Sequence, residues 1–332
     1  MIMAKFDDIV GQEHLTEYFK KVIETGEVAH AYIIEGEMRS GKEFIARVFS
    51  EALLCEGEGD KPCGRCQSCF QMENNAHPDF YSITHDKPSI ISVDDVRTQI
   101  IQDINTKPFK GRYKIFLINE AEIMTEQAQN ALLKTLEEPP EYVVLILLTT
   151  SKEKLLQTIQ SRCVKLSLKP VDKKILKKYL MKEFKIPDYK ADIAVSFSQG
   201  NFGKAKMLIM NEDFDKMKTE AVSLLKHINE MDAPDIMEAI SKIKEYKYDE
   251  IDYLDIFSVW YRDVLLFKAT NDVNDLVFKQ EIQYIKSVAK KTSYEKIDDI
   301  VQALEKAKSR IKAKANFETC MTLLLEVIKE RG

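Results

Sequence analysis

The stretch AYIIEGEMRSGKEFIARVF, residues 31–49, predicts a strand, a glycine-bounded turn and a helix in immediate succession. Gly36, Gly41 and Lys42 fit the phosphate-loop pattern G-x-x-x-x-G-K, in which backbone N–H groups and a lysine surround nucleotide phosphates at a helix N-terminus. The expected strand Tyr32–Glu35 and helix Phe44–Leu54 supply the context that such a loop needs. A tight turn beside a surface lysine is the alternative, and the flanking elements favour the nucleotide loop.

Further strand-like runs follow in the first half of the chain, separated by amphipathic stretches. The two longest are solidly apolar, as strands covered on both faces must be. The alternation predicts an α/β fold with a parallel sheet and helices on both faces. The expected strands after the first are Phe80–Thr84, Tyr113–Asn119, Val143–Thr150 and Cys163–Leu168.

No strand-like run follows Lys169, and the chain then reads as successive helices with breaks expected at Pro187, Gly200, Gly203, Pro234 and Asn271–Asn274. We therefore predict an α/β domain over residues 1–168, a small helical unit over 169–212 and an all-α domain over 213–332.

Bulk composition limits the function classes. The 332 residues carry a net charge of -5, so contact with a phosphate backbone would need a local basic patch. The start lacks the apolar core of a signal peptide, and the longest apolar run, Val143–Leu148, is too short to span a bilayer. We expect a cytoplasmic protein without a membrane partner.

The metal side of the expected nucleotide site is altered at two positions. Glu43 stands where a Ser or Thr hydroxyl would bind Mg²⁺, and Asn119 stands where an aspartate would support that ion. Glu120 keeps the carboxylate that polarises the attacking water. A carboxylate at residue 43 adds negative charge beside a triphosphate, so the two changes together argue against efficient hydrolysis.

Four cysteines, Cys55, Cys63, Cys66 and Cys69, fall within fifteen residues (55–69). Two successive C-x-x-C steps let thiolates converge on one tetrahedral ion, and a closed four-sulfur site is structural rather than catalytic. Exposed free thiols are the alternative, which this density disfavours. We expect structural zinc. His77, in the segment HPDF, reads as a turn residue and not as a ligand.

The order of several motifs resembles the bacterial clamp-loader ATPases of the AAA+ class. These motifs are FDDIVGQEHL (6–15), HAYIIEGEMRSGK (30–42), the cysteine knuckle, AHPDF (76–80), NEAEIMTEQAQNALLKTLEEPP (119–140) and TIQSRC (158–163). The resemblance covers the whole chain and implies an AAA+ phosphate-loop domain, a three-helix lid and a helical collar. QNALLKTLEEPP and SRC are its most specific parts.

The resemblance implies roles for single residues. Arg162 lies in the segment that supplies an arginine finger to the ATP site of a neighbouring subunit, and its guanidinium suits the charge that develops on the γ-phosphate. An intramolecular ion pair is the alternative for this side chain. Thr150 lies near the sensor position, Lys204 stands where the lid of active members has an arginine, and Val10 and Gly11 match the stretch that frames the adenine.

The departures from the family pattern favour a rigid end subunit that is a poor ATPase alone but part of a DNA-directed DNA polymerase holoenzyme. On the resemblance we expect zinc, ATP and Mg²⁺ bound only weakly or not at all, and contacts with gamma/tau and delta subunits through the collar, with the sliding clamp, and with primed DNA in the assembled complex. The alternatives are an active motor subunit of the gamma/tau kind and a self-standing zinc-knuckle nucleic-acid binder.

Overall fold

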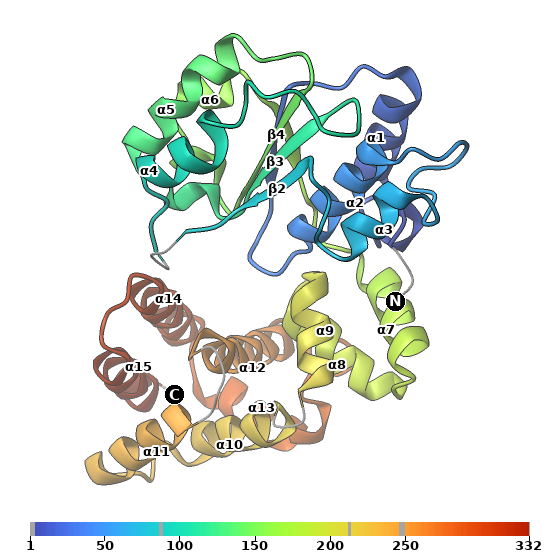
Figure 1. Ribbon diagram of the computed structural model, residues 1–332. Coiled ribbons are helices and arrows are strands. Elements are labelled where there is room, and N and C mark those ends of the chain that lie inside the picture. The colour runs from blue at the N-terminus through green and yellow to red at the C-terminus, as the bar shows by residue number, and fades with distance from the viewer. Residues whose placement is uncertain (1–3, 86–88, 212–213, 246–249, 332) are drawn as a thin grey trace. The chain divides into compact units, whose positions relative to one another are not determined.

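The computed structural model describes residues 4–85, 89–211, 214–245 and 250–331 (Figure 1). It separates into two compact units, one of Met1–Tyr179 with Gly200–Lys204 and one of Leu180–Gln199 with Ala205–Gly332. The expected boundary at residues 212–213 lies outside the described residues. None of the described helices has the length and apolar character needed to cross a membrane.

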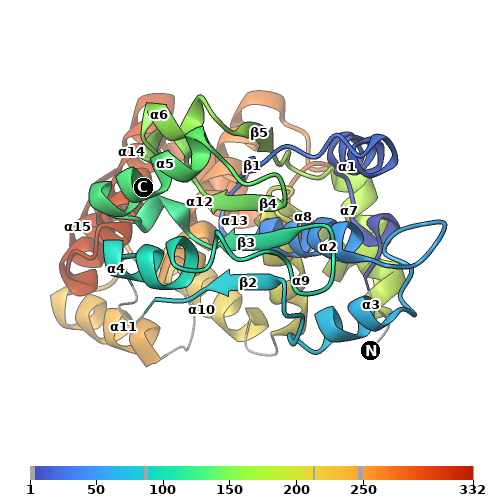
Figure 2. The ribbon, with the colours of Figure 1, turned by 45° about the horizontal axis from the view of Figure 1, so that its top comes forward.

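A five-stranded sheet forms the centre of the first unit, in the order β2-β3-β4-β1-β5, with every neighbouring pair parallel (Figure 2). The strands are β1 (Ala31–Glu35), β2 (Phe80–Ile83), β3 (Lys114–Ile118), β4 (Val143–Thr149) and β5 (Val164–Ser167). All five expected strands are confirmed, each within two residues at either end. Parallel strands that are buried on both faces carry no polar alternation, which is why β3 and β4 read as unbroken apolar runs.

Two apolar layers cover the sheet. Tyr32, Ile34 and their counterparts on β3 and β4 pack against α1 (Glu13–Thr25), α2 (Lys42–Leu54) and α3 (Gln67–Glu73). Ala31, Ile33 and the alternate residues of β3 and β4 pack on the opposite side, against α4 (Val93–Val96), α5 (Glu126–Glu137) and α6 (Gln157–Gln160). Figure 1 shows the two groups of helices on opposite sides of the strands. The expected α/β fold is confirmed.

The remaining helices lie after the last strand. In chain order they are α7 (Lys173–Phe184), α8 (Asp188–Ser198), α9 (Phe202–Met210), α10 (Phe214–His227), α11 (Ala233–Glu245), α12 (Glu250–Thr270), α13 (Ile282–Lys291), α14 (Tyr294–Lys312) and α15 (Phe317–Arg331). Within the second unit, Trp260 and Phe257 of α12 are fully buried, as are Ile300 of α14 and Met321 of α15. This part of the described chain is all-α, as expected.

Two expected helix breaks fall inside a helix: Pro234 lies in the first turn of α11, and Gly203 in that of α9. Gly203 lies in the first turn of α9, which begins at Phe202, and not between two helices. The break falls at Gly200, where φ is +86°, and Asn201 caps the new helix by accepting the N–H of Lys204 at 3.1 Å. A capped first turn tolerates glycine because Asn201 supplies the hydrogen bond that starts the helix.

Candidate functional site

The predicted phosphate loop has the expected shape. β1 ends at Glu35, the turn runs from Gly36 to Gly41, and α2 begins at Lys42. Gly41 adopts φ +94°, a conformation that L side chains rarely adopt, which explains the glycine at the foot of the helix. The loop thus retains the backbone of a nucleotide site.

Lys42 is turned back onto the loop. Its Nζ donates to the carbonyl oxygens of Gly36 at 2.7 Å and Glu37 at 2.8 Å. Burial lowers the pKa of the Lys42 ammonium, and the carboxylates of Glu122, Glu120 and Glu37 oppose that shift. The lysine that would neutralise phosphate oxygens is held by main-chain carbonyls and faces three acids.

The residues expected on the Mg²⁺ side of the site differ in their exposure and in the elements that carry them. Glu43 is exposed in the first turn of α2, where the helix dipole favours a negative charge. Glu120 is exposed, directly after β3, with φ +51°, and Asn119 before it is half-buried. A non-glycine residue in this left-handed region is uncommon and recurs at functional sites.

Glu122 is a site residue that the sequence reasoning missed. Its Oε1 accepts the backbone N–H of Thr150 at 3.1 Å and the Thr150 hydroxyl at 2.5 Å. Burial alone would raise the pKa of the Glu122 carboxyl, but hydrogen bonds from Thr150, Thr149 and the Glu122 backbone together lower it. The hydroxyl of Thr150, the predicted sensor residue, is therefore hydrogen-bonded to Glu122. In the sequence, the second acid of the segment NEAE (119–122) was the feature that could have indicated this residue.

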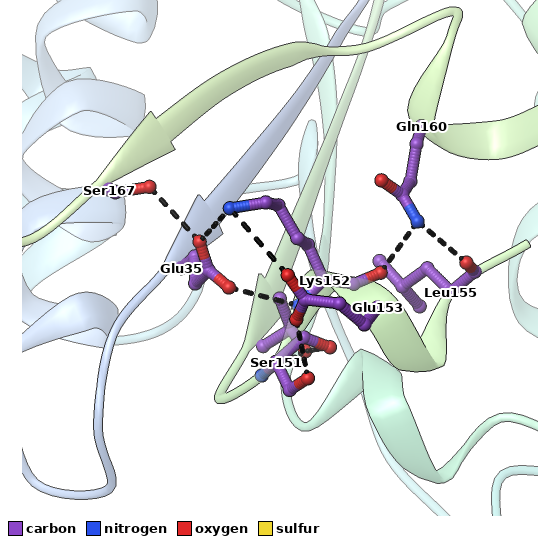
Figure 3. A network of polar contacts seen from close by, with 8 residues as sticks. Glu35, Ser151, Lys152, Glu153, Leu155, Gln160 and Ser167 are labelled. Atoms are coloured by element: carbon purple, nitrogen blue, oxygen red, sulfur yellow. Dashed lines mark hydrogen bonds and ion pairs between the residues drawn. The ribbon is translucent and has the colours of Figure 1, made fainter. Parts of the chain in front are cut away.

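A second missed group joins β1 to the loop after β4 and to β5 (Figure 3). Glu35 accepts the N–H of Lys152 at 3.1 Å, the Lys152 ammonium at 2.8 Å and the Ser167 hydroxyl at 3.1 Å. Burial would raise the pKa of the Glu35 carboxyl, yet these donors hold it below its ordinary value. This network fixes the strand end from which the phosphate loop starts, and a lone acid that ends an apolar strand was its only sequence signal.

The predicted adenine-framing stretch contacts the chain just before α7. Gln12 exchanges two hydrogen bonds with the Lys169 backbone: its Nε2 donates to the carbonyl at 2.5 Å and its Oε1 accepts the N–H at 3.0 Å. Gly11 has φ +71°, and a Cβ there would lie 2.5 Å from a methyl carbon of Val171. Val10 is half-buried beside it. Val171 therefore fills the space beside Gly11.

The first turn of α9 touches the phosphate loop. Asn201 Nδ2 donates to the Met38 carbonyl at 2.8 Å, and the Gly203 N–H donates to the Arg39 carbonyl at 3.0 Å. A Cβ at Gly203 would lie 2.1 Å from the Arg39 oxygen, so no side chain fits at residue 203 in this conformation. Lys204, the predicted counterpart of a lid arginine, follows in the same turn, but the residue that meets the loop is Gly203.

Arg162 lies between α6 and β5 and is paired within the chain. Its Nη2 contacts Glu137 Oε1 at 2.9 Å, and its Nη1 donates to the Thr158 carbonyl at 3.0 Å. The Arg162 and Glu137 side chains are 35% and 52% exposed. An ion pair this exposed contributes about 0.2–1 kcal/mol, so loss of the Glu137 contact alone costs little.

The four predicted metal ligands come together. The Sγ atoms of Cys55, Cys63, Cys66 and Cys69 all lie within 4.8 Å of one another, with Cys55–Cys66 at 4.0 Å and Cys63–Cys69 at 3.9 Å. A tetrahedral zinc with Zn–S bonds of about 2.3 Å requires sulfur–sulfur distances of about 3.8 Å. The backbone N–H of Arg65 lowers the pKa of the Cys63 thiol, whereas burial raises the pKa of the Cys55 and Cys69 thiols. This cluster fits a metal ion.

Ser68, His77 and Asp79 lie beside the cysteines but do not form a nucleophilic triad. The Ser68 hydroxyl donates to the Leu54 carbonyl at 2.7 Å and lies 2.6 Å from His77 Nε2. His77 Nδ1 accepts the Asp79 backbone N–H at 3.1 Å, which assigns the ring proton to Nε2. The histidine therefore donates to the serine instead of activating it, and His77 is a structural residue as expected.

Two family models match the chain. One described as DNA polymerase III, delta subunit, matches residues 11–172, and one described as DNA polymerase III, delta subunit, C terminal, matches residues 214–328. The chain is 27% identical over 313 residues to the DNA polymerase III subunit delta' of Bacillus subtilis, and the match covers 93% of each protein.

Other relatives match over shorter parts of their length. The chain is 39% identical over 176 residues to the DNA polymerase III subunit tau/gamma of Haemophilus influenzae, covering 53% of this chain but 25% of that protein. The chain therefore spans only a quarter of this relative. A solved gamma subunit-related protein of Thermotoga maritima aligns with a TM-score of 0.48 at 18% identity, over 94% of this chain and 99% of that one.

Proposed function

The chain belongs to the family of bacterial DNA polymerase III clamp-loader subunits, and from that premise we propose that it is a loader subunit of the delta prime kind. In this role it helps to place the sliding clamp on primed DNA, as part of the polymerase holoenzyme, and lends Arg162 to the ATP site of an adjoining subunit. The proposed lid spans residues 169–212, and the proposed collar, which packs against gamma/tau and delta subunits, spans residues 213–332.

The observation that carries this proposal is a phosphate loop that keeps its backbone but not its metal ligands. Glu43 and Asn119 replace the hydroxyl and aspartate that hold Mg²⁺ in active members, and Lys42 is engaged by the Gly36 and Glu37 carbonyls. Asn201 and Gly203, just before Lys204, contact the Met38 and Arg39 carbonyls of the loop. The protein's own nucleotide site is thus a poor ATPase, although Glu120 remains.

Arg162 acts on a different molecule in this proposal. Its support is the exposed, weak pairing with Glu137, which a γ-phosphate of higher charge can replace at low cost. The planar guanidinium fork matches phosphate oxygens in two hydrogen bonds, a geometry that lysine lacks.

The cysteine cluster holds zinc in this proposal. Four thiolates without an oxygen or nitrogen donor select zinc over magnesium or calcium, and four sulfurs leave no open coordination position. When bound, the ion supplies structural cross-linking and no chemistry. The ion would tie Cys55, Cys63 and Cys66 to Cys69 in α3.

A motor subunit of the gamma/tau kind is the second candidate, because the 39% identity to a tau/gamma protein exceeds the 27% identity to delta'. Reconstitution separates the two. The purified chain is mixed with ATP and Mg²⁺ alone, and then with the motor and delta subunits, clamp and primed DNA. We expect hydrolysis only in the assembled complex. Turnover by the chain alone, abolished by Lys42→Ala, would establish the motor role instead.

A further inference from the structure

The loop before β3 displays an aromatic side chain, Phe109, to solvent. Phe109 is 83% exposed, more than any other large apolar side chain that the described residues present at the surface. Phe70, on α3, is 67% exposed. Lys110 connects their two segments, because its Nζ donates to Gln67 Oε1 at 2.5 Å and Gln67 lies one turn before Phe70. We call Phe70, Lys107, Phe109 and Lys110 the Phe109 surface.

The loop that carries Phe109 is firmly anchored. Asp79 is 1% exposed, and its carboxylate accepts the backbone N–H groups of Phe109 at 2.6 Å, Lys110 at 2.9 Å and Gly111 at 3.4 Å. Hydrogen bonds to an ionised acceptor are the strong ones. The backbone of the loop is therefore fixed from inside while the ring of Phe109 stands outside.

The anchor continues to the metal cluster. The Asp79 backbone donates to His77, which contacts Ser68 of α3, and α3 carries the ligand Cys69. The motif AHPDF thus joins the cysteine knuckle to the loop. An exposed phenylalanine held this rigidly gains nothing for folding, because its ring is not removed from water.

The loop that carries Phe109 is basic, apart from the buried Asp79 carboxylate that holds its backbone. Residues 104–112 contain Lys107, Lys110 and Arg112 and no acidic residue. Lys107 is exposed, and the hydrogen-bond acceptor of Lys110 is a neutral amide, so both charges remain available to a polyanion. Aromatic rings next to lysines form the combination that binds single-stranded nucleic acid, with bases stacked on the rings and phosphates on the ammonium groups.

We propose that the Phe109 surface binds single-stranded DNA, with a base stacked on Phe109 and backbone phosphates beside Lys107 and Lys110. A ring on a fixed loop suits stacking, because the backbone that carries the ring is already ordered before a base covers it. The assignment concerns the isolated chain and does not require a nucleotide site or a neighbouring subunit.

The test uses the full zinc-loaded chain and a fluorescein-labelled oligothymidylate of about 20 nucleotides, read by anisotropy at several salt concentrations. We expect Phe109→Ala to weaken binding by at least about fivefold, the lower limit for loss of one stacked base. Phe109→Tyr keeps the aromatic face and should bind like the wild type, whereas Phe109→Leu should not. Lys110→Ala should reduce the salt slope by about 0.7, the value of one single-strand phosphate contact.

Tyr189→Ala is the matched control, because this ring is 65% exposed on α8 and should not matter. Zinc content and circular dichroism must match the wild type for every variant. Undetectable binding at low salt, equal affinity after Phe109→Ala, or full retention by Phe109→Leu would overturn the proposal. Retention by leucine would show that binding of the oligonucleotide does not depend on aromatic stacking at residue 109.

Discussion

Removal of the Asp79 carboxylate should release the loop at residues 109–111. This buried side chain is the common acceptor for three successive backbone N–H groups, at 2.6, 2.9 and 3.4 Å. Asp79→Ala removes the acceptor of these three N–H groups. Because Asp79 is only 1% exposed, water does not readily replace it. Asp79→Asn keeps one carbonyl oxygen and removes the charge.

The expected cost follows from the two short bonds. A hydrogen bond to a charged group contributes about 1.5–3 kcal/mol, so Asp79→Ala should destabilise the loop by about 3–6 kcal/mol. The third bond, at 3.4 Å, adds less. Asp79→Asn should lose about half of that amount, because its neutral oxygen still accepts one N–H.

Hydrogen–deuterium exchange read by mass spectrometry can measure this locally. We expect the amides of residues 109–111 to exchange about 10²–10⁴-fold faster in Asp79→Ala, since each 1.4 kcal/mol is a factor of ten. Asp7→Ala is the control: Asp7 is 84% exposed in its pair with Lys20, so its loss should cost no more than about 1 kcal/mol. Unchanged exchange at residues 109–111 in Asp79→Ala would refute the anchoring role.

Four further outcomes are expected. With ATP and Mg²⁺, the isolated wild-type chain and Lys42→Ala should both release phosphate at background; an Mg²⁺-dependent wild-type rate that Lys42→Ala abolishes would contradict the proposal that this chain is a poor ATPase. Metal analysis should find about one zinc per reduced chain, and Cys63→Ser should lower both zinc content and Tm; a zinc-free wild type would exclude the structural ion. The pKa of the Glu35 carboxyl is lowered from 4.5, so its stabilisation is present above about pH 4.5 and disappears as pH falls through the depressed pKa. Glu35→Gln should therefore be less stable than wild type in urea at neutral pH, with the gap closing in acid; a gap independent of pH would show that the charge is irrelevant. Glu137→Gln should leave ATP hydrolysis by the assembled loader unchanged or raise it by up to about fivefold, because it frees Arg162; a large loss would assign the pair an active role.

The sheet was readable from the sequence because burial on both faces demands unbroken apolar runs. Val143–Thr149 and Lys114–Ile118 have no competing interpretation at that length. The convergence of the four cysteines could be predicted for a similar reason, since four thiols within fifteen residues come together through local turns alone. In both cases the signal and the structure lie in the same short segment.

The long-range contacts around the phosphate loop could not be predicted from the sequence. The Glu35 and Lys152 partners are 117 residues apart, and Asn201 and Met38 are 163 apart, so no local pattern connects them. Gly203 was misread as a helix break because a glycine usually ends a helix, whereas here it gives the Arg39 carbonyl room to approach. Single polar or small residues acquire such roles only through the tertiary fold.

The central claim is that this subunit acts through Arg162 on an ATP bound elsewhere. The most direct measurement is a single-turnover assay of the reconstituted loader with clamp and primed DNA, comparing the wild type with Arg162→Ala and Arg162→Lys at equal assembly. We predict that hydrolysis at the adjoining site slows by about 10³-fold or more in both variants. About one ATP per complex should then remain unhydrolysed after the other sites have turned over. Hydrolysis of every bound ATP at the wild-type rate in Arg162→Ala would contradict the account.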